Sequence, residues 1–281
     1  MNDNNGAKLL VVGRHGNTRW NVDFNRIIEI IRAGGTPERI IASTNPSLSM
    51  LGHAQSRPTG RWLKKNHPKF DRYYTADKLR HLQTVKDFDL PGSEWYVTQD
   101  LRERNFGIFD LLKVYRGDIP EHEALEKLKE LTAFNHDFHN TPLAGESFAS
   151  LSSRIGRLIN KLKYDYHNEE VIFLTSEETA WAIKERIEHL GQKRYEELRR
   201  STDPRDQFQN AGLTFWTRKD PKTGALAPNF QWTRNVVPWN MDYSTDWREF
   251  QPLKVNMETI DELIKHQLLE VEEELKQLEK I

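Results

Sequence analysis

The chain has 281 residues, enough for one large α/β domain or two small ones, and 30% of its residues are charged although the net charge is only −1. This balance gives no electrostatic argument for binding nucleic acid or an anionic membrane surface, so neither partner is expected. There is no cysteine for disulfides or thiolate chemistry, no basic leader and no segment near the ~18 apolar residues of a membrane span, and we expect a cytoplasmic protein.

Hydrophobic patterning predicts alternating strands and helices in the first third of the chain. Residues 8–12 form a short aliphatic run that ends at a glycine, which is typical of a buried central strand. Residues 24–35 place isoleucines at helical spacing before a glycine pair, which predicts a short helix. Residues 49–68 predict the start of another helix, and residues 71–88 predict a short strand followed by a helix.

The same alternation continues through the middle of the chain. Residues 94–107 indicate a strand and then a loop, and residues 124–131 and 148–162 carry helical periodicity. Residues 169–175 form a second buried strand, which precedes a helix over residues 177–190. We therefore predict a three-layer α/β/α fold with a mostly parallel central sheet, in which sites form beyond the carboxyl ends of the strands.

The last seventy residues are less regular. Residues 210–216 are strand-like, the aromatic-rich segment 230–250 cannot be assigned, and residues 257–281 predict a charged helix. That helix carries one apolar seam, formed by Ile264, Leu268, Val271, Leu275 and Leu278. Fewer than three heptads favour a terminal helix packed on its own domain, with a homodimer as the alternative. We expect one domain over residues 1–256, with insertions near 22–47 and 108–144, followed by this helix.

Six short stretches occur in an order that resembles one known family. They are GRHGNTRWN at 13–21, LSMLGHAQ at 48–55, YYTADKLRHLQT at 73–84, LRERNFG at 101–107, GESF at 145–148 and VIFLTSEET at 171–179. Each is a weak signal alone, but together they are similar to the histidine phosphatase superfamily, also called phosphoglycerate-mutase-like. The resemblance covers roughly residues 8–218 and implies that family's fold.

The resemblance implies a role for each matching residue. His15 takes the position of the nucleophile that attacks a phosphomonoester, and the phosphohistidine is then hydrolysed by water. Arg14 and Arg80 supply planar guanidinium donors for the phosphoryl oxygens. Asn21 aligns with an asparagine that donates to the phosphate, and Glu103 matches the acid/base glutamate that protonates the leaving oxygen.

Simpler explanations exist for several of these residues. A lone histidine after a strand is most often a polar residue in a turn, and Glu103 between two arginines resembles a solvated run of charges. Four other histidines, His53, His81, His136 and His139, suggest a metal site, but no further ligand is spaced to complete one. We therefore expect no metal and no cofactor.

Position 176 departs from the family pattern. In relatives a second histidine and a glycine usually follow the last central strand, whereas Ser176 and Glu177 stand here. A neutral hydroxyl contributes ~0.5–1.5 kcal/mol where a charge-assisted bond contributes ~1.5–3. By analogy with an oxyanion-hole donor, the rate would fall ~10²–10³-fold. Either the sequence has drifted towards binding, or a deliberate His-to-Ser change has silenced an enzyme; the retention of the other five residues favours the second.

The resulting hypothesis is a phosphomonoester hydrolase that works through phosphohistidine and is impaired by Ser176. The alternative is a non-catalytic phosphate-binding module. The substrate is expected to be a phosphorylated small molecule or a phosphoprotein, and residues 22–47 and 108–144 hold the positions that choose the leaving group in relatives. Phe109, Tyr115, Phe134 and Phe138 in the second segment suggest an aromatic wall. Hydrolysis is favoured over a mutase reaction because nothing in the sequence indicates a phosphoenzyme protected from water.

Overall fold

The computed structural model describes residues 6–32, 45–107 and 138–252, together with part of 256–276. The chain divides into two compact units, Met1–Gln251 and Pro252–Ile281. The predicted helix at 124–131 and three of the four aromatic residues expected to line the pocket, Phe109, Tyr115 and Phe134, lie outside the described residues.

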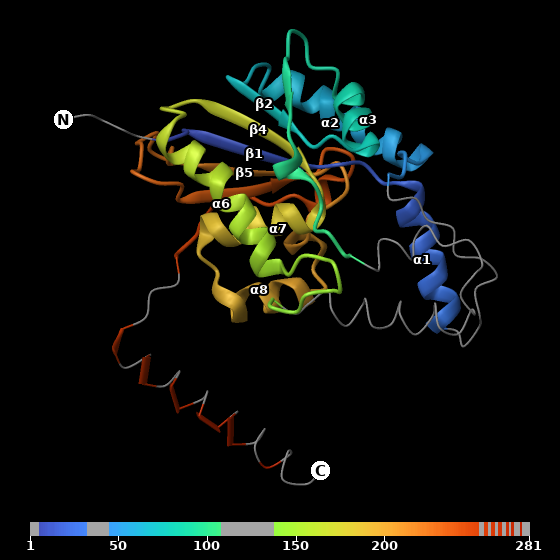
Figure 1. Cartoon of the computed structure of the whole chain (residues 1–281). Coiled ribbons are helices and arrows are strands. Elements are labelled where there is room, and N and C mark those ends of the chain that lie inside the picture. Colours follow the sequence, from blue (N-terminus) through green and yellow to red (C-terminus); the bar gives the residue numbers. More distant parts are fainter. Residues whose placement is uncertain are drawn as a thin grey trace. The chain divides into compact units, whose positions relative to one another are not determined.

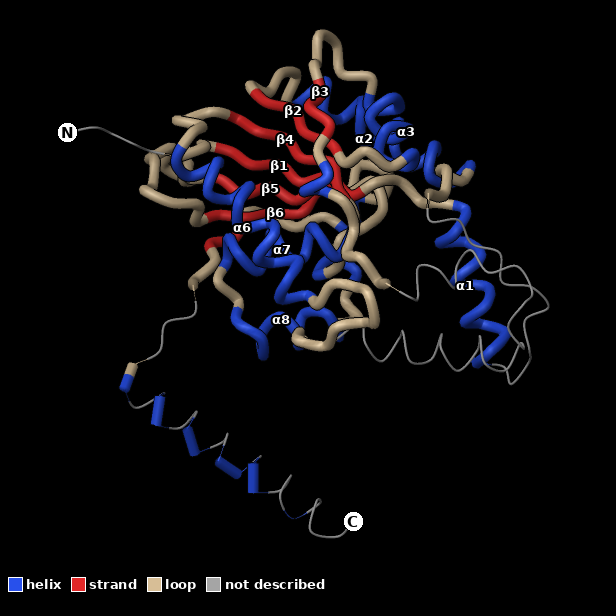
Figure 2. The backbone as a smooth tube through the Cα atoms, viewed as in Figure 1, coloured by secondary structure: helices blue, strands red, loops and turns tan. Residues whose placement is uncertain are grey.

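A seven-stranded sheet forms the centre of the first unit (Figures 1 and 2). Its order is β3-β2-β4-β1-β5-β6-β7, with β3, β2, β4 and β1 parallel and β5, β6 and β7 antiparallel. The strands are β1 Leu9–Arg14, β2 Arg72–Thr75, β3 Trp95–Val97, β4 Glu170–Thr175, β5 Leu213–Thr217, β6 Trp232–Val236 and β7 Arg248–Glu249. The mostly parallel sheet that the sequence predicts is therefore confirmed, with antiparallel strands added at one edge.

Helices cover both faces of this sheet (Figure 2). The α-helices are α1 Arg19–Arg32, α2 Met50–Asn66, α3 Leu79–Phe88, α6 Phe148–Tyr164, α7 Glu177–Glu188 and α8 Gly191–Arg200. Three 3₁₀ turns are η1 Gln99–Leu101, η2 Pro204–Asp206 and η3 Met241–Tyr243. Helices α2 and α3 pack on one face, and α6, α7 and α8 pack on the other, which is the predicted three-layer arrangement.

The alternation of side chains along β1 explains the two cores. Leu10 and Val12 contribute to the cluster that contains α6, α7 and α8, while Leu9 and Val11 point into the cluster with α2 and α3. Successive strand residues point to opposite faces, so a strand buried on both sides is hydrophobic throughout. The core therefore fixes β1 and β4 in the centre, and the carboxyl ends of both strands are held rigidly.

Two elements differ from the sequence-based expectation. Helix α1 begins at Arg19, earlier than predicted, because the Thr18 hydroxyl accepts a hydrogen bond from the Asn21 backbone N–H and caps the helix. The aromatic-rich segment that could not be assigned contains β6, η3 and β7. Arg234 of β6 lies over the Trp62, Phe215 and Trp247 rings, so a cation within this strand packs among aromatic side chains.

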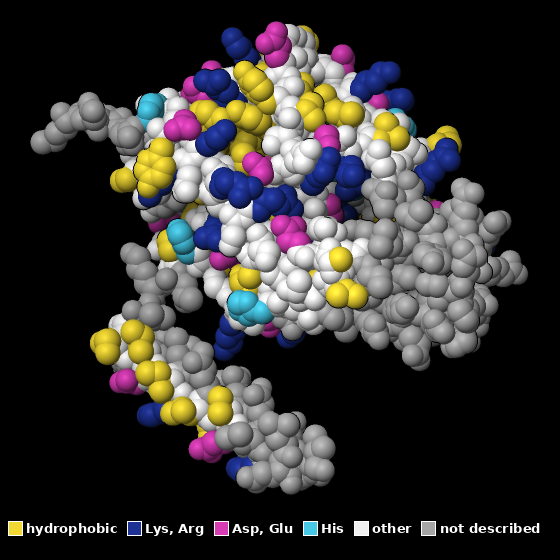
Figure 3. Space-filling view, in the orientation of Figure 1, with side chains coloured by type: hydrophobic (Ala, Val, Ile, Leu, Met, Phe, Trp, Pro, Cys, Tyr) yellow, Lys and Arg dark blue, Asp and Glu magenta, His cyan; other side chains and the backbone are white. Residues whose placement is uncertain are grey.

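The surface carries both signs of charge. Lysine and arginine side chains are interspersed with acidic ones on the described part of the face in Figure 3. Among the described residues, no helix has the length and apolar character that crossing a membrane requires. In the second unit, Ile264, Leu268 and Val271 of the apolar seam are 48%, 58% and 50% exposed, while Leu275 and Leu278 lie outside the described residues.

Candidate active site

The central pair of strands brings His15 and Ser176 to the same edge of the sheet. Arg14, the last residue of β1, is paired in parallel register with Thr175, the last residue of β4. His15 directly follows Arg14, and Ser176 directly follows Thr175. The His15 backbone N–H donates to the Thr175 carbonyl at 3.0 Å. Both side chains are buried, with residue exposures of 5% and 0%. The carboxyl edge of a parallel sheet is where α/β proteins place their ligands.

Gly16 allows the chain to turn directly after His15. A Cβ atom at this position would lie 2.6 Å from the Gly52 carbonyl oxygen and 2.5 Å from the Ser56 hydroxyl. The first turn of α2 therefore packs against the backbone of the RHG triplet, and only glycine fits. The Gly16 N–H donates to Thr84 of α3 at 3.1 Å, which ties the triplet to the helix that carries Arg80.

The His15 ring is held in one tautomer by its neighbour Gly16. Its Nδ1 lies 2.8 Å from the Gly16 carbonyl oxygen, which can only accept, so Nδ1 carries a hydrogen and the lone pair of the neutral ring lies on Nε2. Burial lowers the pKa of His15 well below its ordinary value, and the charges of Arg80 and Arg14 lower it further. At neutral pH the ring is therefore uncharged.

Arg80 and Ser176 meet in front of His15, and His81 joins them. An Arg80 guanidinium nitrogen donates to the Ser176 hydroxyl at 3.2 Å, and His81 Nε2 lies 2.9 Å from the same oxygen. The His15 and His81 rings are edge-to-face with centroids 5.1 Å apart. His81 is fully buried. One compact cluster thus contains two imidazoles, a guanidinium and a hydroxyl.

Arg14 is at the cluster but is paired with an acid. One of its terminal nitrogens lies 2.7 Å from the Glu177 carboxylate, and the other donates to the Phe208 carbonyl at 2.6 Å. Glu177 also accepts from Arg199 at 3.1 Å, so its carboxylate bridges two arginines. A phosphoryl group that approaches Arg14 therefore meets a carboxylate already bound there.

Glu103 lies at the amino end of α7. Its carboxylate accepts from the Glu178 backbone N–H at 3.2 Å and from the Arg104 N–H at 3.0 Å. Burial raises the pKa of Glu103 above its ordinary value, while the charge of Arg80 opposes the rise. A carboxyl group that retains its proton to higher pH than usual is suited to act as a general acid.

The segment that carries Glu103 is held at several points. The Thr175 hydroxyl donates to the Leu101 carbonyl and the Thr179 hydroxyl to the Arg102 carbonyl, both at 2.6 Å. Arg154 of α6 donates to the Asp100 carbonyl at 2.6 Å. These bonds hold the segment around Glu103 on a rigid support.

Glu103 does not belong to a solvated run of charges. Arg102 pairs with Asp77, and Arg104 is 1% exposed and donates to the Glu146 and Asn140 carbonyls. Arg80 is therefore the principal cation that lowers the pKa of Glu103, and Arg104 lowers it through its backbone N–H. The relevant cation comes from α3.

Asn21 is the predicted residue that the structure does not bring into this cluster. Its amide oxygen accepts from the Thr18 N–H at 3.0 Å and from the Thr18 hydroxyl at 2.8 Å. Among the described contacts it makes none with His15, Arg80 or Ser176. A role for Asn21 in phosphate binding remains a prediction.

The sequence patterns do not reveal two residues of the cluster. They suggest His81 only as a metal ligand, and Glu177 only as general acidity near the site. The signal for His81 is its position directly after Arg80 in the matching stretch, where both side chains are buried in the first turn of α3.

Of the other described histidines considered for a metal site, His53 pairs with Asp87 at 2.6 Å. Phe138, expected in the pocket wall, packs against Phe148 and Tyr195 in the core.

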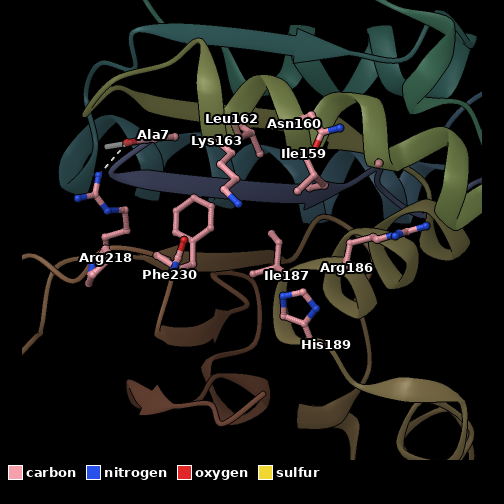
Figure 4. A pocket seen from close by; sticks show the side chains of 14 residues that line it. Ala7, Ile159, Asn160, Leu162, Lys163, Arg186, Ile187, His189, Arg218 and Phe230 are labelled. Atoms are coloured by element: carbon pink, nitrogen blue, oxygen red, sulfur yellow. Dashed lines mark hydrogen bonds between the residues drawn. The ribbon is translucent and has the colours of Figure 1, made fainter. Parts of the chain in front are cut away.

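A separate pocket of about 310 Å³ lies at the opposite end of β1 (Figure 4). Ala7, just before β1, lines it together with Lys163, Ile187, Arg218 and Phe230. Because ligand sites of open α/β sheets lie at the carboxyl ends of the strands, this pocket is not the candidate active site.

The sequence matches the histidine phosphatase superfamily (branch 1) over residues 10–204, well over half of the chain. A cluster with a neutral histidine, two arginines and a protonatable carboxyl group has the chemical groups that phosphoryl transfer uses. The chain belongs to the histidine phosphatase superfamily.

Curated relatives include 2,3-bisphosphoglycerate-dependent phosphoglycerate mutases. That of Methylorubrum populi is 26% identical over 152 residues, which is 53% of this chain and 63% of the relative. That of Brucella ovis is 26% identical over 153 residues, 53% of this chain and 65% of the relative. The alignments with these relatives thus span less than two thirds of their length.

Solved structures share the fold. The mycobacterial glucosyl-3-phosphoglycerate phosphatase superposes with a TM-score of 0.54 at 19% identity, covering 88% of this chain and 99% of that chain. A phosphoserine phosphatase variant from Entamoeba histolytica, in complex with phosphoserine, gives a TM-score of 0.51 at 19% identity, covering 79% and 95%. At this identity the similarity establishes the phosphoglycerate-mutase-like fold.

Proposed function

We propose that this chain is a phosphomonoester hydrolase that acts through a phosphohistidine at His15. The observation that carries the proposal is the state of the His15 ring, which is neutral, buried and held by Gly16 with its lone pair on Nε2. Arg80 beside it supplies positive charge where phosphoryl oxygens gather. The superfamily membership supports the same reaction class.

In the first step, His15 Nε2 attacks phosphorus and the bond from phosphorus to the leaving oxygen breaks. The alkoxide receives the proton of Glu103, so the alcohol leaves neutral. Arg80 and the N–H groups at the amino end of α7 stabilise the negative charge that spreads over the phosphoryl oxygens. Ser176 contributes its hydroxyl to the same oxygens.

In the second step, water attacks the phosphohistidine. Glu103, now ionised, accepts a proton from that water, and the P–N bond breaks to give inorganic phosphate and the free imidazole. The cycle returns both residues to their starting protonation states. No metal ion is required for either step.

The direct test combines turnover with trapping of the intermediate. An aryl phosphate is incubated with the protein and a chelator, and the protein, quenched in alkaline denaturant, is analysed for an acid-labile, base-stable phosphoryl group. We expect slow, chelator-insensitive hydrolysis and label on His15. Turnover that the chelator abolishes would contradict the proposal.

The substrate class and the choice of hydrolysis belong to the same proposal. A phosphorylated small molecule or a phosphoprotein fits the site chemistry. Some relatives are mutases and others phosphatases, and we place hydrolysis first because nothing in the sequence indicates a phosphoenzyme protected from water. Incubation with 3-phosphoglycerate and a bisphosphate primer should then release phosphate rather than yield the isomer.

Glu177 supports a second candidate, a phosphate-binding module without catalysis. Its carboxylate is bound to Arg14, so the site carries its own anion. A ligand bound only by the native state raises the melting temperature once its concentration exceeds Kd. A phosphate-dependent shift with no His15-dependent turnover would favour this candidate over the enzyme.

Replacing Glu177 by glutamine is expected to tighten phosphate binding. Arg14 becomes available when the competing carboxylate is gone, and the partly exposed ion pair is worth roughly 0–1 kcal/mol, which corresponds to a gain of up to about fivefold in affinity. Calorimetric titration with inorganic phosphate measures this gain. Glu185→Gln on the same helix, where the carboxylate accepts from Ser152, is the matched control and should leave the affinity unchanged. Equal affinities in all three proteins would exclude competition by Glu177.

We also propose that the C-terminal helix joins two copies of the chain. The exposed seam residues Ile264, Leu268 and Val271 support this assembly. Deletion of residues 257–281 is expected to halve the mass measured by light scattering. Serine at these three positions should do the same, whereas serine at the charged positions Lys265 and Glu272 should not. An unchanged mass after deletion would return the helix to a role within one chain.

A further inference from the structure

Ser176 stands at the position of a helix cap but does not act as one. Serine at the N-cap of a helix usually accepts a hydrogen bond from the second or third N–H. Here the Ser176 side chain makes no such bond, and the Glu103 carboxylate accepts from the Glu178 N–H instead. The Ser176 hydroxyl is thereby left to face Arg80 and His81.

His81 is placed where one of its ring nitrogens meets that hydroxyl. Its Nε2 lies 2.9 Å from Ser176 Oγ, while Nδ1 makes no hydrogen bond of normal geometry, although the Lys78 and Thr175 backbones act on the ring. A buried histidine in a purely structural role normally satisfies both nitrogens. The Ser176 hydroxyl is the side chain to which the His81 ring makes a hydrogen bond of normal geometry.

We propose that Ser176 and His81 together replace the second imidazole of the phosphate pocket. The Ser176 hydroxyl donates its hydrogen to a phosphoryl oxygen, and its Oγ accepts from Arg80 and from the Nε2–H of His81. Ser176 touches the substrate, and His81 is a positioning residue that acts through it. The inference rests on the proposed function, since it concerns the same phosphate site.

We call the chain of hydrogen bonds from His81 through Ser176 to the phosphate the relay. The surroundings of His81 favour a relay in which this ring is neutral. Burial lowers the pKa of His81 well below its ordinary value, and the charge of Arg80 lowers it further, although the Lys78 and Thr175 backbones oppose the fall. A neutral imidazole can donate from one nitrogen only, and donation from Nε2 orients the serine hydroxyl outward. Two donors on Ser176 Oγ also polarise its O–H bond, because hydrogen bonds in a chain strengthen one another.

The relay explains why a serine stands at position 176, and the explanation does not need a deliberate His-to-Ser change that silenced the enzyme. The His81 ring lies 2.9 Å from Ser176 Oγ, so an imidazole at position 176 that followed the direction of the serine side chain would meet that ring. Side chains at positions 81 and 176 share one space near His15. In this chain the imidazole that fills this space comes from α3, at position 81, and not from the residue after β4, at position 176. This supports a site built around serine.

The test measures inorganic phosphate binding by calorimetry in variants whose folding is checked by thermal melting. His81→Leu removes the donor and keeps apolar bulk, and we expect phosphate to bind about threefold to tenfold more weakly, the value of one neutral hydrogen bond. His81→Gln keeps an N–H donor and should retain most of the affinity. Equal losses in the leucine and glutamine variants would show that His81 only packs, and would overturn the relay.

Coupling between the two residues gives the second measurement. In a Ser176→Ala background, His81→Leu should cause no further loss, because the relay is already broken; fully additive losses would contradict it. The double variant Ser176→His/His81→Ala, which moves the imidazole between positions, should bind phosphate at least as well as the wild type. A loss equal to that of His81→Ala alone would also contradict the inference.

These outcomes are separate from the fate of the proposed function. The function fails if turnover does not depend on His15, whereas the relay is judged by phosphate affinity and needs no turnover. A wild-type protein that binds no phosphate would overturn the relay as well. With turnover present, the loss in His81→Leu should appear in kcat/KM, with restoration in His81→Gln.

Discussion

Replacing His15 by alanine is expected to abolish hydrolysis of an aryl phosphate and the acid-labile phosphoenzyme with it. The imidazole is the attacking group, so its removal leaves only the binding and electrostatic contributions of the pocket. By comparison with the loss of a nucleophile in other covalent enzymes, the rate should fall on the order of 10⁴-fold or more. Steady-state assays and phosphoenzyme trapping measure the two effects together.

His53→Ala is the matched control for this change. His53 is on α2 and pairs with Asp87, away from the cluster around His15. Its removal should leave kcat and the amount of phosphoenzyme within about twofold of the wild type, because substitutions away from a site usually have small effects. Residual turnover in His15→Ala at the wild-type rate would require another nucleophile and would end the phosphohistidine proposal.

The protonation of His15 adds a pH dependence. Because burial lowers the pKa of His15 in the folded protein, the unfolded chain binds the proton more readily than the folded one. The contribution of His15 to the free energy of unfolding is therefore fully present above the ordinary histidine pKa of about 6.5. It is lost as pH falls from there towards the pKa of His15 in the folded protein. Activity should likewise persist below pH 6.5 instead of declining there.

The strands and the site edge follow from local sequence. Runs such as residues 9–12 and 171–174 are buried on both faces of the sheet, so every residue in them is hydrophobic. The ends of these strands can therefore be predicted from the sequence. Since parallel strands end at one edge, their pattern alone places His15 and Ser176 together. By contrast, β6 contains Thr233, Arg234 and Asn235, a polar run whose cation packs on aromatic rings from distant segments.

The partners of the site residues could not be predicted in the same way. Arg14 binds a carboxylate 163 positions further along the chain, at Glu177, and His81 reaches Ser176 from another helix. Such pairs depend on side-chain directions at helix ends, which periodicity does not encode. The local motif predicted most of the residues that gather, although not the position of Asn21 or the part played by His81 and Glu177, and the fold decided which of them touch.

Glu103 illustrates how burial overrides a local charge pattern. Flanking arginines would suggest a lowered pKa, but Arg102 is paired with Asp77 and Arg104 faces backbone carbonyls. Desolvation is the largest influence, and it raises the pKa. A carboxyl group whose folded pKa is raised contributes stability below its unfolded value of about 4.5, and that contribution is lost as pH rises through the folded pKa. Removing its charge should therefore not destabilise the protein at neutral pH.

Replacing Glu103 by glutamine is expected to slow esters with poor leaving groups by about 10²–10⁴-fold, while aryl phosphates lose far less. The alkoxide of an alkyl ester needs the Glu103 proton to depart, whereas a phenolate scarcely needs it. Glutamine keeps an oxygen that can accept from the Glu178 and Arg104 N–H groups, so thermal melting at pH 7 should show equal or greater stability. The measurement compares kcat/KM for an alkyl and an aryl phosphate in both proteins. Equal losses on the two substrates would mean that Glu103 positions the phosphate or the helix, and that the proton comes from another group.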